Sequence, residues 1–451
     1  MIKYETNSGL IQPGQTFVAI KGYTVDGHDF IKEAIKNGAV QAIVEHTTED
    51  NIPQQVVPST KEFIKEVLVN EYAEALEGIK LIGVTGTNGK TTTCYLTYQL
   101  LKTLGVNAAY LGTIGFYIND EIIELPNTTP EILTVYKLIL DAKAKGAQYL
   151  VMEVSSHSLE RAQVAGLKFT MGAFTNLTQD HLDFHETMEN YLKAKLKLIT
   201  YLEPNGKMIL NADDPASAAF AKLAPAETIG NDGDYQINSF VIEPHATMIH
   251  FSYQQKDYEV KTNLTSKFNI YNYLTALGIV NQLGFKIEDI IAKTSEIYPP
   301  KGRCETIKVG DAFAVVDFAH TPDAVEKVLD AYHEFKKARI ITIVGCGGDR
   351  DPKKRPIMGK IATDKSDYVI FTSDNHRTED PLKILDDIIR DNPANNYEME
   401  VDRGKAIKKG LDMLKTDDLL MLLGKGHENY QIIGHEKIPF DDSEIVKNYS
   451  K

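Results

Sequence analysis

Short apolar runs that end in small polar residues recur along the chain, and an amphipathic stretch follows most of them. With their polar ends, these runs cover residues 81–86, 148–154, 172–178, 313–320, 339–345, 367–375 and 418–426. Strands that are apolar on both faces and alternate with helices are typical of βαβ units in parallel sheets. The pattern therefore predicts an α/β fold. Ligands of such open sheets bind beyond the carboxyl ends of the strands, where these polar residues lie.

Two breaks in the pattern indicate three domains, which agrees with a length of 451 residues at about 150 residues per domain. The region to about Gly78 is expected to be a small α/β unit, with FVAIKG and VQAIVEH as strand candidates. A second break lies at PPKGRCE (299–305), after a more β-rich patch at residues 235–262. The expected domains are residues 1–78, 79–304 and 305–451.

Composition and charge exclude several classes of protein. Lys and Arg number 49 against 63 Asp and Glu, a net charge of −14, which argues against binding to nucleic acid or anionic membranes but leaves a small anionic substrate possible. Cys94, Cys304 and Cys346 lack the spacing of a disulfide framework or zinc ribbon and suit a reducing cytosol. The N-terminus does not read as a signal peptide, and no apolar run approaches the ~18 residues of a membrane span. We expect a soluble cytoplasmic protein.

The segment GVTGTNGKTTT (residues 83–93) carries the strongest local signal. An apolar run leads into a glycine-rich turn, after which Lys90 and Thr91 begin an expected helix. The N–H groups of such a loop hold phosphate, the lysine neutralises its charge, and the hydroxyl binds Mg²⁺. Val84 stands where the strict Walker spacing asks for glycine. A plain glycine turn is the alternative, but strand, loop, lysine–threonine pair and helix together predict a nucleoside triphosphate site.

Acidic and histidine side chains follow the next two runs. Glu153 ends YLVMEV, where a carboxylate can ligate the metal of the nucleotide, although many strands end in a carboxylate. TNLTQDHLDFH then offers His181 as a metal ligand. Two alternatives stay open for this segment. Thr178 or Asp180 caps a helix and the histidines are surface residues, or His181 and His185 belong to a zinc hydrolase, although their spacing matches no common zinc motif.

The last runs of the chain end in ionic and amide side chains. DFAHTPDAV places Asp317 and His320 before an expected helix start. No lysine–threonine pair follows the glycines of GCGGDRDPKKRP, so we interpret this segment as an anion-binding loop with Arg350 and Arg355. Each such residue alone is commonly a cap, a turn or a surface charge. Together they predict one cleft for carboxylate and amine groups, to which two further segments contribute Asp374, Asn375, Arg377, Lys425, His427 and Glu428.

One known family carries these segments in the same order, namely TGTNGKTT, EVSSHSL, TNLTQDHLDFH, NADDP, FNIYN, GRCE, DFAHTPDA, GCGGDRDPKKRP, SDNHRTEDP and GKGHENYQ. The chain resembles the Mur ligases, and among them the UDP-N-acetylmuramoyl-tripeptide synthetases, over essentially its whole length. NSGLIQPGQTFVAIKGYTVDG similarly resembles the uridine-binding domain of the family. No single motif is specific to this degree, but the combination is.

The resemblance implies a fold and an activity. It implies that the first domain (1–78) binds the UDP-muramoyl substrate, that the second (79–304) is a P-loop ATPase-like domain, and that the third (305–451) is Rossmann-like and carries the incoming amino acid. It further implies an ATP-dependent ligase of peptidoglycan biosynthesis. Such an enzyme adds the third amino acid to UDP-N-acetylmuramoyl-L-Ala-D-Glu through an acyl phosphate. The expected partners are this precursor and a diamino acid, with no nucleic acid or membrane, and the protein is expected to be a monomer.

Roles at the nucleotide and metals follow from the same resemblance. Lys90, Glu153, His181 and Lys195 are the implied catalytic residues. Mg²⁺ is expected at Thr91, Glu153, His181 and Lys195, and Lys195 matches the carbamylated lysine of the family. The implied ATP-binding residues are Gly86, Thr87, Asn88, Gly89, Lys90, Thr91, Thr92, Asn272, Arg303, Asp317 and His320.

The two other substrates have implied contacts as well. The residues implied at the UDP-muramoyl-dipeptide are Ser8, Tyr23, Thr24, Val25, Asn127, Thr128, Thr129, Ser155, Arg161 and Gln163. Those implied at the amino acid are Arg350, Asp374, Asn375, His376, Arg377, Gly424 and Glu428.

Departures from the family pattern bear on specificity. NSG replaces the usual Asp-Ser-Arg, and Arg161 and Gln163 stand where Gln and Arg are expected. DNHR (374–377) replaces the Asp-Asn-Pro-Arg of diaminopimelate-adding enzymes. Arg377 is retained, and a guanidinium there can pair bidentately with a carboxylate of the amino acid, so meso-diaminopimelate is favoured. His376 in place of proline keeps L-lysine open as the alternative.

Two more distant functions also stay open. A folylpolyglutamate-type or polyglutamate ligase shares the P-loop and the amide chemistry, but not the GGDRDP, DNxR and GKGHE series. A P-loop protein that binds the precursor as a sensor, without ligation, has no need of the set Lys90, Glu153, His181 and Lys195.

Overall fold

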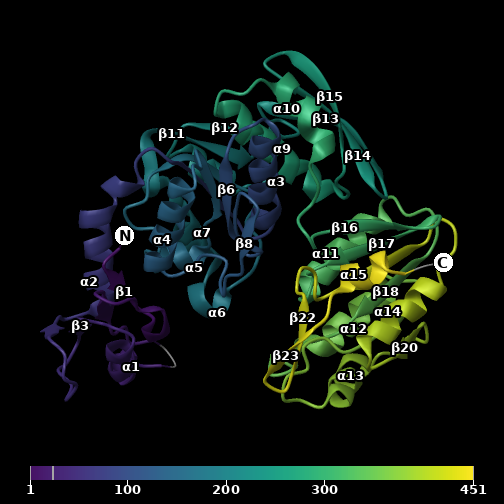
Figure 1. The fold of residues 1–451 in the computed structure, drawn as a ribbon. Coiled ribbons are helices and arrows are strands. Elements are labelled where there is room, and N and C mark those ends of the chain that lie inside the picture. Colours follow the sequence, from purple (N-terminus) through teal and green to yellow (C-terminus); the bar gives the residue numbers. More distant parts are fainter. Residues whose placement is uncertain (1, 23–24, 450–451) are drawn as a thin grey trace. The chain divides into compact units, whose positions relative to one another are not determined.

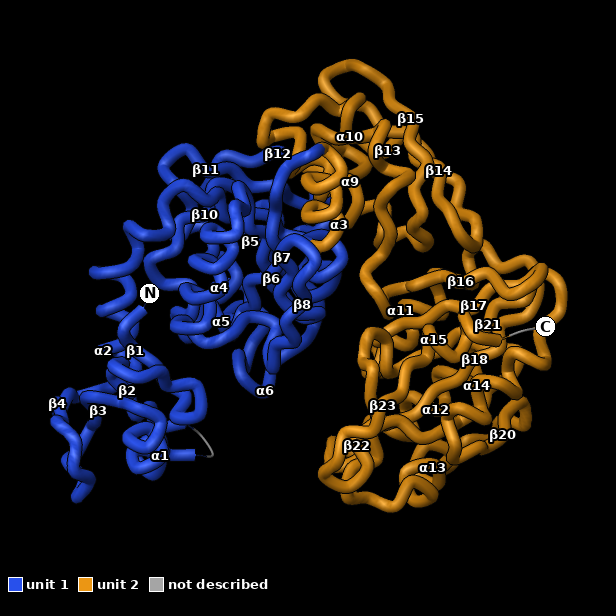
Figure 2. The backbone as a smooth tube through the Cα atoms, in the orientation of Figure 1, with its two compact units in different colours: residues 1–94, 105–227 blue, residues 95–104, 228–451 orange. Residues whose placement is uncertain are grey.

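The structure, a computed structural model, describes residues 2–22 and 25–449. The chain divides into two compact units, residues 1–94 with 105–227 and residues 95–104 with 228–451 (Figure 2). The division passes through helix α3 (Lys90–Thr103) and strand β12 (Ala226–Gly230). In the part of the chain that is described, no helix combines the length and the apolar character needed to cross a membrane.

The first unit begins with a small parallel sheet in the order β1-β2-β3-β4 (Figure 2). Its strands are β1 (Tyr4–Glu5), β2 (Thr16–Val18), β3 (Gln41–Val44) and β4 (Gln54–Val56), and its helices are α1 (Ile31–Lys36) and α2 (Thr60–Val67). Phe17, Ile31 and Val44 are buried together between sheet and helix. Both strand candidates of this region are confirmed.

A larger sheet forms the rest of the first unit, with strands in the order β12-β11-β10-β5-β9-β6-β7-β8. The strands other than β12 are β5 (Lys80–Thr85), β6 (Ala108–Gly112), β7 (Gly115–Ile118), β8 (Glu121–Ile123), β9 (Tyr149–Glu153), β10 (Phe169–Phe174) and β11 (Leu202–Asn211). The helices are α4 (Ile132–Ala144), α5 (Ser156–Glu160), α6 (Leu182–His185), α7 (Met188–Leu196) and α8 (Ser217–Ala221). Because β5 pairs in parallel with β9 and β10, the carboxyl ends of all three meet at one edge.

The second unit contains the expected β-rich patch and then a helical segment. The antiparallel strands are β13 (Tyr235–Glu243), β14 (Ala246–Tyr253) and β15 (Lys256–Thr262), and the helices are α9 (Lys267–Gln282) and α10 (Ile287–Lys293). Alternating side chains of β14 are buried, as expected of a sheet with one face on a core. The patch predicted at residues 235–262 is therefore confirmed.

A six-stranded sheet in the order β16-β17-β21-β18-β19-β20 completes the second unit, and only β16 is antiparallel. The strands are β16 (Glu305–Val309), β17 (Ala312–Asp317), β18 (Ile340–Val344), β19 (Tyr368–Phe371), β20 (Tyr397–Met399) and β21 (Leu419–Leu423). The helices are α11 (Pro322–His333), α12 (Lys354–Asp364), α13 (Pro381–Ile389), α14 (Arg403–Asp412) and α15 (Asp442–Lys447), and a hairpin comprises β22 (Tyr430–Ile433) and β23 (Glu436–Pro439).

Helices cover both faces of this sheet, as the apolar strands require. Helices α11, α12 and α13 pack on one face, and α14 and α15 pack on the other (Figure 1). Thr321 caps α11 by accepting a hydrogen bond from Ala324 N, and Pro322 occupies the first turn. The predicted α/β fold is confirmed, with mostly parallel sheets in the three regions.

Candidate active site

The glycine-rich loop connects the central strand β5 to helix α3, which begins at Lys90 as predicted. Gly86 has a φ of +149°, and a Cβ there would lie 1.9 Å from Thr175 Oγ1, so only glycine fits. Lys90 Nζ donates to the carbonyls of Gly86 at 3.0 Å and Thr87 at 2.8 Å. The lysine therefore lies over the loop, in which Thr87 N donates to Asn176 O at 2.8 Å and Asn88 N donates to Asn176 Oδ1 at 2.9 Å.

Glu153 ends β9 next to this loop and is fully buried. Its carboxylate accepts hydrogen bonds from Thr91 Oγ1 at 2.9 Å, Tyr110 OH at 2.6 Å and Thr113 N at 2.8 Å. Burial raises the pKa of Tyr110 well above its ordinary value, and the Glu153 charge adds to this, so the phenol remains a donor. A Cβ on Gly112 would lie 2.2 Å from Glu153 Oε1, so this glycine makes room for the carboxylate.

Lys195 projects from α7 and is only 1% exposed. Its Nζ donates to Gly86 O at 2.7 Å and lies 4.2 Å from the centroid of the Tyr191 ring. Burial, and secondarily the charge of Lys90, lowers the pKa of Lys195 well below its ordinary value. A neutral amine is a nucleophile, whereas an ammonium group is not, so this environment suits a lysine that reacts with carbon dioxide.

His181 lies before α6 with a left-handed φ of +52° and is partly exposed. Its ring centroid is 4.7 Å from that of His157, whose pKa falls to about 4 through burial. The alternative that Thr178 or Asp180 caps this helix is wrong, because the N-cap position is His181 itself and no side chain caps the helix.

The surrounding side chains bear on the hypothesis that His181 and His185 bind zinc. Nε2 of His185 lies 2.9 Å from Ser156 Oγ, so this ring is engaged by a hydroxyl inside the fold. No group of three or more His, Cys, Asp or Glu able to hold a metal ion occurs within residues 2–22 and 25–449. The oxygen atoms of Thr91 and Glu153, by contrast, are adjacent at the loop and are the ligand type that Mg²⁺ prefers.

Hydroxyl side chains implied at the UDP-muramoyl-dipeptide gather around Glu153. The hydroxyl of Thr128 lies 2.9 Å from that of Thr113, and Thr129 Oγ1 donates to Glu153 O at 2.9 Å. Ser155 N donates to Thr129 Oγ1 at 3.3 Å. Two of the three implied substrates thus have candidate contacts at the same edge of this sheet.

The remaining precursor candidates are dispersed in the first unit. Asn127 is exposed on the segment before α4, Arg161 has its guanidinium 5.4 Å from the Phe184 ring, and Gln163 is buried. In the small N-terminal sheet, Ser8 Oγ donates to Glu33 Oε2 at 2.6 Å, and Val25 is exposed. Tyr23 and Thr24 lie outside the described residues.

Four nucleotide candidates belong to the second unit. Asn272 is buried on α9 and donates to Asn269 Oδ1 at 2.9 Å. The carboxylate of Asp317 accepts from the N–H groups of Cys304 and Ala319, each at 2.8 Å, although burial still raises its pKa. The guanidinium of Arg303 lies 4.9 Å from the Phe318 ring, and the ring of His320 is 4.6 Å from the same phenylalanine. The other nucleotide candidates, residues 86–92, lie in the first unit.

The amino-acid candidates follow the neighbouring strands β18, β19 and β21 of the second unit. Asp374 and Asn375 are buried after β19, and Gly424 follows β21 with a φ of +111°. A Cβ on Gly424 would lie 2.7 Å from Asp374 Oδ2, so glycine allows the two loops to approach. The structure therefore brings Asp374, Asn375, Gly424 and Glu428 together, as the sequence predicts.

Arg377 follows Asn375 in the same loop and has a φ of +51°. Its Nη1 donates to Gly348 O at 2.8 Å and to Asn375 O at 3.3 Å. Its backbone is held by the hairpin, since Arg377 N donates to Ile432 O at 3.0 Å and Gly434 N donates to Arg377 O at 2.8 Å. The nearby His376 Nδ1 lies 3.1 Å from Glu379 O, and this contact closes the turn.

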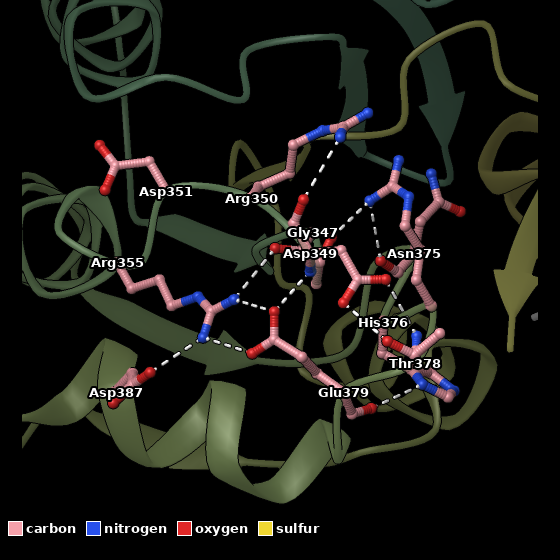
Figure 3. Close-up of polar contacts among 12 residues, drawn as sticks. Gly347, Asp349, Arg350, Asp351, Arg355, Asn375, His376, Thr378, Glu379 and Asp387 are labelled. Atoms are coloured by element: carbon pink, nitrogen blue, oxygen red, sulfur yellow. Dashed lines mark hydrogen bonds and ion pairs between the residues drawn. The ribbon is translucent and has the colours of Figure 1, made fainter. Parts of the chain in front are cut away.

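Arg355 does not serve the predicted anion-binding role, which is a correction. It is only 2% exposed, and its guanidinium pairs with Glu379 at 2.8 Å and Asp387 at 2.9 Å (Figure 3). Asp349 adds a second link between the loops, because its Oδ1 accepts from Thr378 Oγ1 at 2.8 Å. Arg350 is exposed at the same loop and remains a candidate contact. The Arg355 cluster therefore holds the two loops in place rather than binding a ligand.

Several residues of the site were missed from the sequence. Tyr110 and Thr113 hold Glu153, although AAYLGT is itself an apolar run that ends in a polar residue and could have indicated them. Tyr191 touches both Thr87 and Lys195, but no pattern in the sequence connects these positions.

Comparison with known proteins defines the class of this chain. Three models of the Mur ligase family match it in succession: the family's catalytic domain at residues 4–80, the Mur ligase middle domain at 84–280, and the Mur ligase, glutamate ligase domain at 302–426. The chain belongs to the Mur ligase family, whose members are ATP-dependent ligases.

Within that family, several of the proteins similar to this chain share one name. The chain is 40% identical to the UDP-N-acetylmuramoyl-L-alanyl-D-glutamate--2,6-diaminopimelate ligase of Halalkalibacterium halodurans over 97% of this chain and 92% of that protein. It is 42% identical to ligase 1 of the same name from Clostridium acetobutylicum over 96% and 92%. A solved structure of a ligase with this name has a TM-score of 0.69 and 31% identity over 98% of this chain and 93% of that chain. A ligase complex with ADP from Thermotoga maritima, at 22% identity, shares the fold with a TM-score of 0.71.

Proposed function

We propose that this protein is the ATP-dependent ligase that joins meso-2,6-diaminopimelate to UDP-N-acetylmuramoyl-L-alanyl-D-glutamate in cytoplasmic peptidoglycan synthesis. The observation that carries the proposal is the arrangement at Gly86, whose carbonyl oxygen accepts hydrogen bonds from both Lys90 and the buried Lys195. The paired oxygens of Thr91 and Glu153 lie on the same loop edge. A phosphate loop next to a lysine with a lowered pKa suits ligation better than simple nucleotide binding.

The chemistry begins with a carboxylate, which is a poor electrophile. Transfer of the γ-phosphoryl group of ATP to that carboxylate gives an acyl phosphate and ADP; attack by the amine then gives the amide and phosphate. Both reactants of the first step are anionic, and the charge of Lys90 offsets their repulsion. The N-terminus of α3, where the loop ends, orients the phosphates.

The residues of the first unit also fit Mg²⁺, because Thr91 and Glu153 present adjacent oxygens to a hard cation. Glu153 and His181 would hold a second ion in this proposal, and Lys195 would join them as a carbamate, in which the side chain carries a carboxylate in place of an ammonium group. Bound Mg²⁺ supplies charge neutralisation at the phosphates. The lowered pKa of Lys195 supports the carbamate, since only the neutral amine combines with carbon dioxide.

The amino-acid pocket carries the choice of diaminopimelate over L-lysine. Diaminopimelate has a second carboxylate where lysine has only an ammonium group at the end of its chain. The guanidinium of Arg377, held by Gly348 and the hairpin, can pair with this additional carboxylate, which lysine lacks. His376 closes the loop turn through Glu379, so its substitution for proline is compatible with this position of Arg377.

In the proposed enzyme, each of the three domains binds one substrate. Residues 1–78 bind the uridine end of the precursor, residues 79–304 bind ATP, and residues 305–451 bind the amino acid. The protein acts as a monomer and needs neither nucleic acid nor membrane.

Phosphate release tests the proposal. The purified protein is given ATP, Mg²⁺ and the UDP-muramoyl-dipeptide, with diaminopimelate or L-lysine in separate reactions. We expect release with diaminopimelate and none above background with lysine. The Lys195→Ala variant should still bind the UDP-precursor but lose turnover. Release with lysine alone would contradict the assigned amino acid, and a wild type that binds the precursor without any turnover would favour the sensor.

A further inference from the structure

Lys425 is a fully buried cation at the centre of the proposed amino-acid pocket. It follows Gly424 at the end of β21, and neither the family resemblance nor the relatives' names give it a role. Its Nζ donates to Glu428 Oε2 at 2.9 Å and to Asn375 Oδ1 at 3.1 Å. Asp374 Oδ1 lies 3.9 Å away. One ammonium group thus contacts three of the residues implied at the amino acid.

These contacts determine how Asn375 presents its amide. Asn375 Oδ1 accepts from Lys425 Nζ and also from Ile432 N at 2.9 Å, so two donors from different elements define the oxygen end. The opposite end, Nδ2, donates to Glu428 Oε2 at 2.9 Å. Because an amide has distinct donor and acceptor ends, this triangle of Lys425, Asn375 and Glu428 allows one orientation only.

The same contacts place one positive and two negative side chains side by side in the pocket. Asp374 and Glu428 are carboxylates on neighbouring loops, with side chains only 9% and 19% exposed. Lys425 lies within 4 Å of a carboxylate oxygen of each residue, and its positive charge offsets the repulsion between the two carboxylates. Only one oxygen of Glu428 is used in this way, and no described residue donates a hydrogen bond to Oε1. That oxygen can accept from a ligand ammonium group.

We propose that Lys425 is a positioning residue that holds Asn375 and Glu428 in the arrangement that recognises the amino-acid substrate. This inference rests on the proposed function and adds to it the residue that organises the specificity pocket. Lys425 itself touches no reacting atom. Its removal should weaken binding of the diamino acid and leave the nucleotide and the UDP-precursor bound as before.

The test compares steady-state constants of four proteins: wild type, Lys425→Met, Glu428→Gln and the double variant. Lys425→Met keeps the length of the side chain and removes its charge. Loss of a charge-assisted hydrogen bond corresponds to about a 10-fold or greater rise in KM for diaminopimelate. KM for ATP and for the UDP-precursor should change by less than about 2-fold. In the double variant, the rise in KM for diaminopimelate should be well below the product of the two single-variant rises, because both substitutions act through the same carboxylate.

Two further variants separate positioning from stability. Lys425→Gln keeps a donor for Asn375 and should raise KM for diaminopimelate less than Lys425→Met does. Arg339→Met is the matched control, since Arg339 pairs with buried Asp418 before β21, at the opposite edge of the same sheet. It should lower the melting temperature without raising KM for the amino acid.

Three outcomes would overturn the proposal. These are an unchanged KM for diaminopimelate in both Lys425 variants, full multiplication of the effects in the double variant, and failure of both Lys425 variants to fold when Arg339→Met folds. Absence of turnover in the wild type would instead refute the proposed function itself, so the two failures are distinguishable.

Discussion

Burial decides the chemistry available to Lys195, because an ammonium group loses its hydration when it leaves water. Its Nζ has a carbonyl partner, Gly86 O, and the Tyr191 ring, and its nearest cationic neighbour, Lys90, disfavours the charged form further. A lysine in water keeps its proton at neutral pH and is a poor nucleophile. The buried position of Lys195 therefore makes its amine more nucleophilic than that of a lysine in water.

Stability should depend on pH through this residue. The pKa of Lys195 is lowered in the folded chain, whereas the unfolded chain keeps the ordinary value of 10.5. Between these values the unfolded state binds more protons, so the free energy of unfolding rises with pH. The destabilisation is present in full below the folded-state pKa and disappears as the pH approaches 10.5.

Urea unfolding of wild type and Lys195→Met, in buffer free of carbon dioxide, measures this effect between neutral pH and about pH 10. We expect wild type to gain stability relative to the variant as the pH rises. A difference that stays constant over this range, or that moves in the opposite direction, would contradict the assigned environment of Lys195.

At the scale of elements, ion pairs and hydrogen bonds between side chains, rather than apolar packing, hold together the loops after β18 and β19. Arg355 on α12 bridges Glu379 and Asp387, and Asp349 binds Thr378 (Figure 3). A buried guanidinium stabilises such an arrangement only as long as its partners are present, and removal of one member leaves the others unpaired.

Arg355→Met should therefore destabilise the protein. Complete removal of a buried ionic partner costs about 3–5 kcal/mol, and partial exposure of Glu379 and Asp387 reduces the expected loss to about 2 kcal/mol. Lys360→Met is the control on the same helix, because its pair with Asp364 is exposed and should contribute less than about 0.5 kcal/mol. Chemical denaturation measures both variants, and equal losses would show that the Arg355 cluster does not hold the loops.

The elements were predictable from the sequence where a local pattern specifies them. Strands such as β5 and β21 are apolar on both faces, and the start of α11 is marked by Thr321 and Pro322, so short segments sufficed. Arg355 was misread because its neighbours along the chain are basic, whereas its partners lie 24 and 32 residues away. Ion pairs at such separations depend on the packing of α12 against α13 and the adjoining loop, which no local pattern encodes.

The candidate site was predictable to a similar degree. Strand-end residues such as Glu153, Asp374 and Asn375 follow from the alternating pattern, because parallel strands end at one edge. The roles of Lys195 and Lys425 do not, since each depends on complete burial by distant parts of the fold. The resemblance to a family implied a role for Lys195, and the strand-end pattern placed Lys425 in the shared cleft, but only the three-dimensional contacts show which side chains Lys425 holds.

At the scale of the whole molecule, the proposed reaction uses residues of both compact units. Lys90, Glu153 and Lys195, to which we assign the phosphate chemistry, lie in the first unit, and Asn375 and Arg377, to which we assign recognition of the amino acid, lie in the second. The central claim is that both serve the addition of meso-diaminopimelate to the UDP-muramoyl-dipeptide. Neither unit alone defines that product.

The most direct test is the mass of the product formed in competition. Wild-type protein is incubated with ATP, Mg²⁺, UDP-N-acetylmuramoyl-L-alanyl-D-glutamate and equal concentrations of meso-diaminopimelate and L-lysine, and the UDP-linked products are identified by mass spectrometry. Arg377→Met, analysed in parallel, should lose most of the preference. We expect the diaminopimelate tripeptide as the main wild-type product. A lysine tripeptide in its place, or no tripeptide at all from protein that binds ATP, would contradict it.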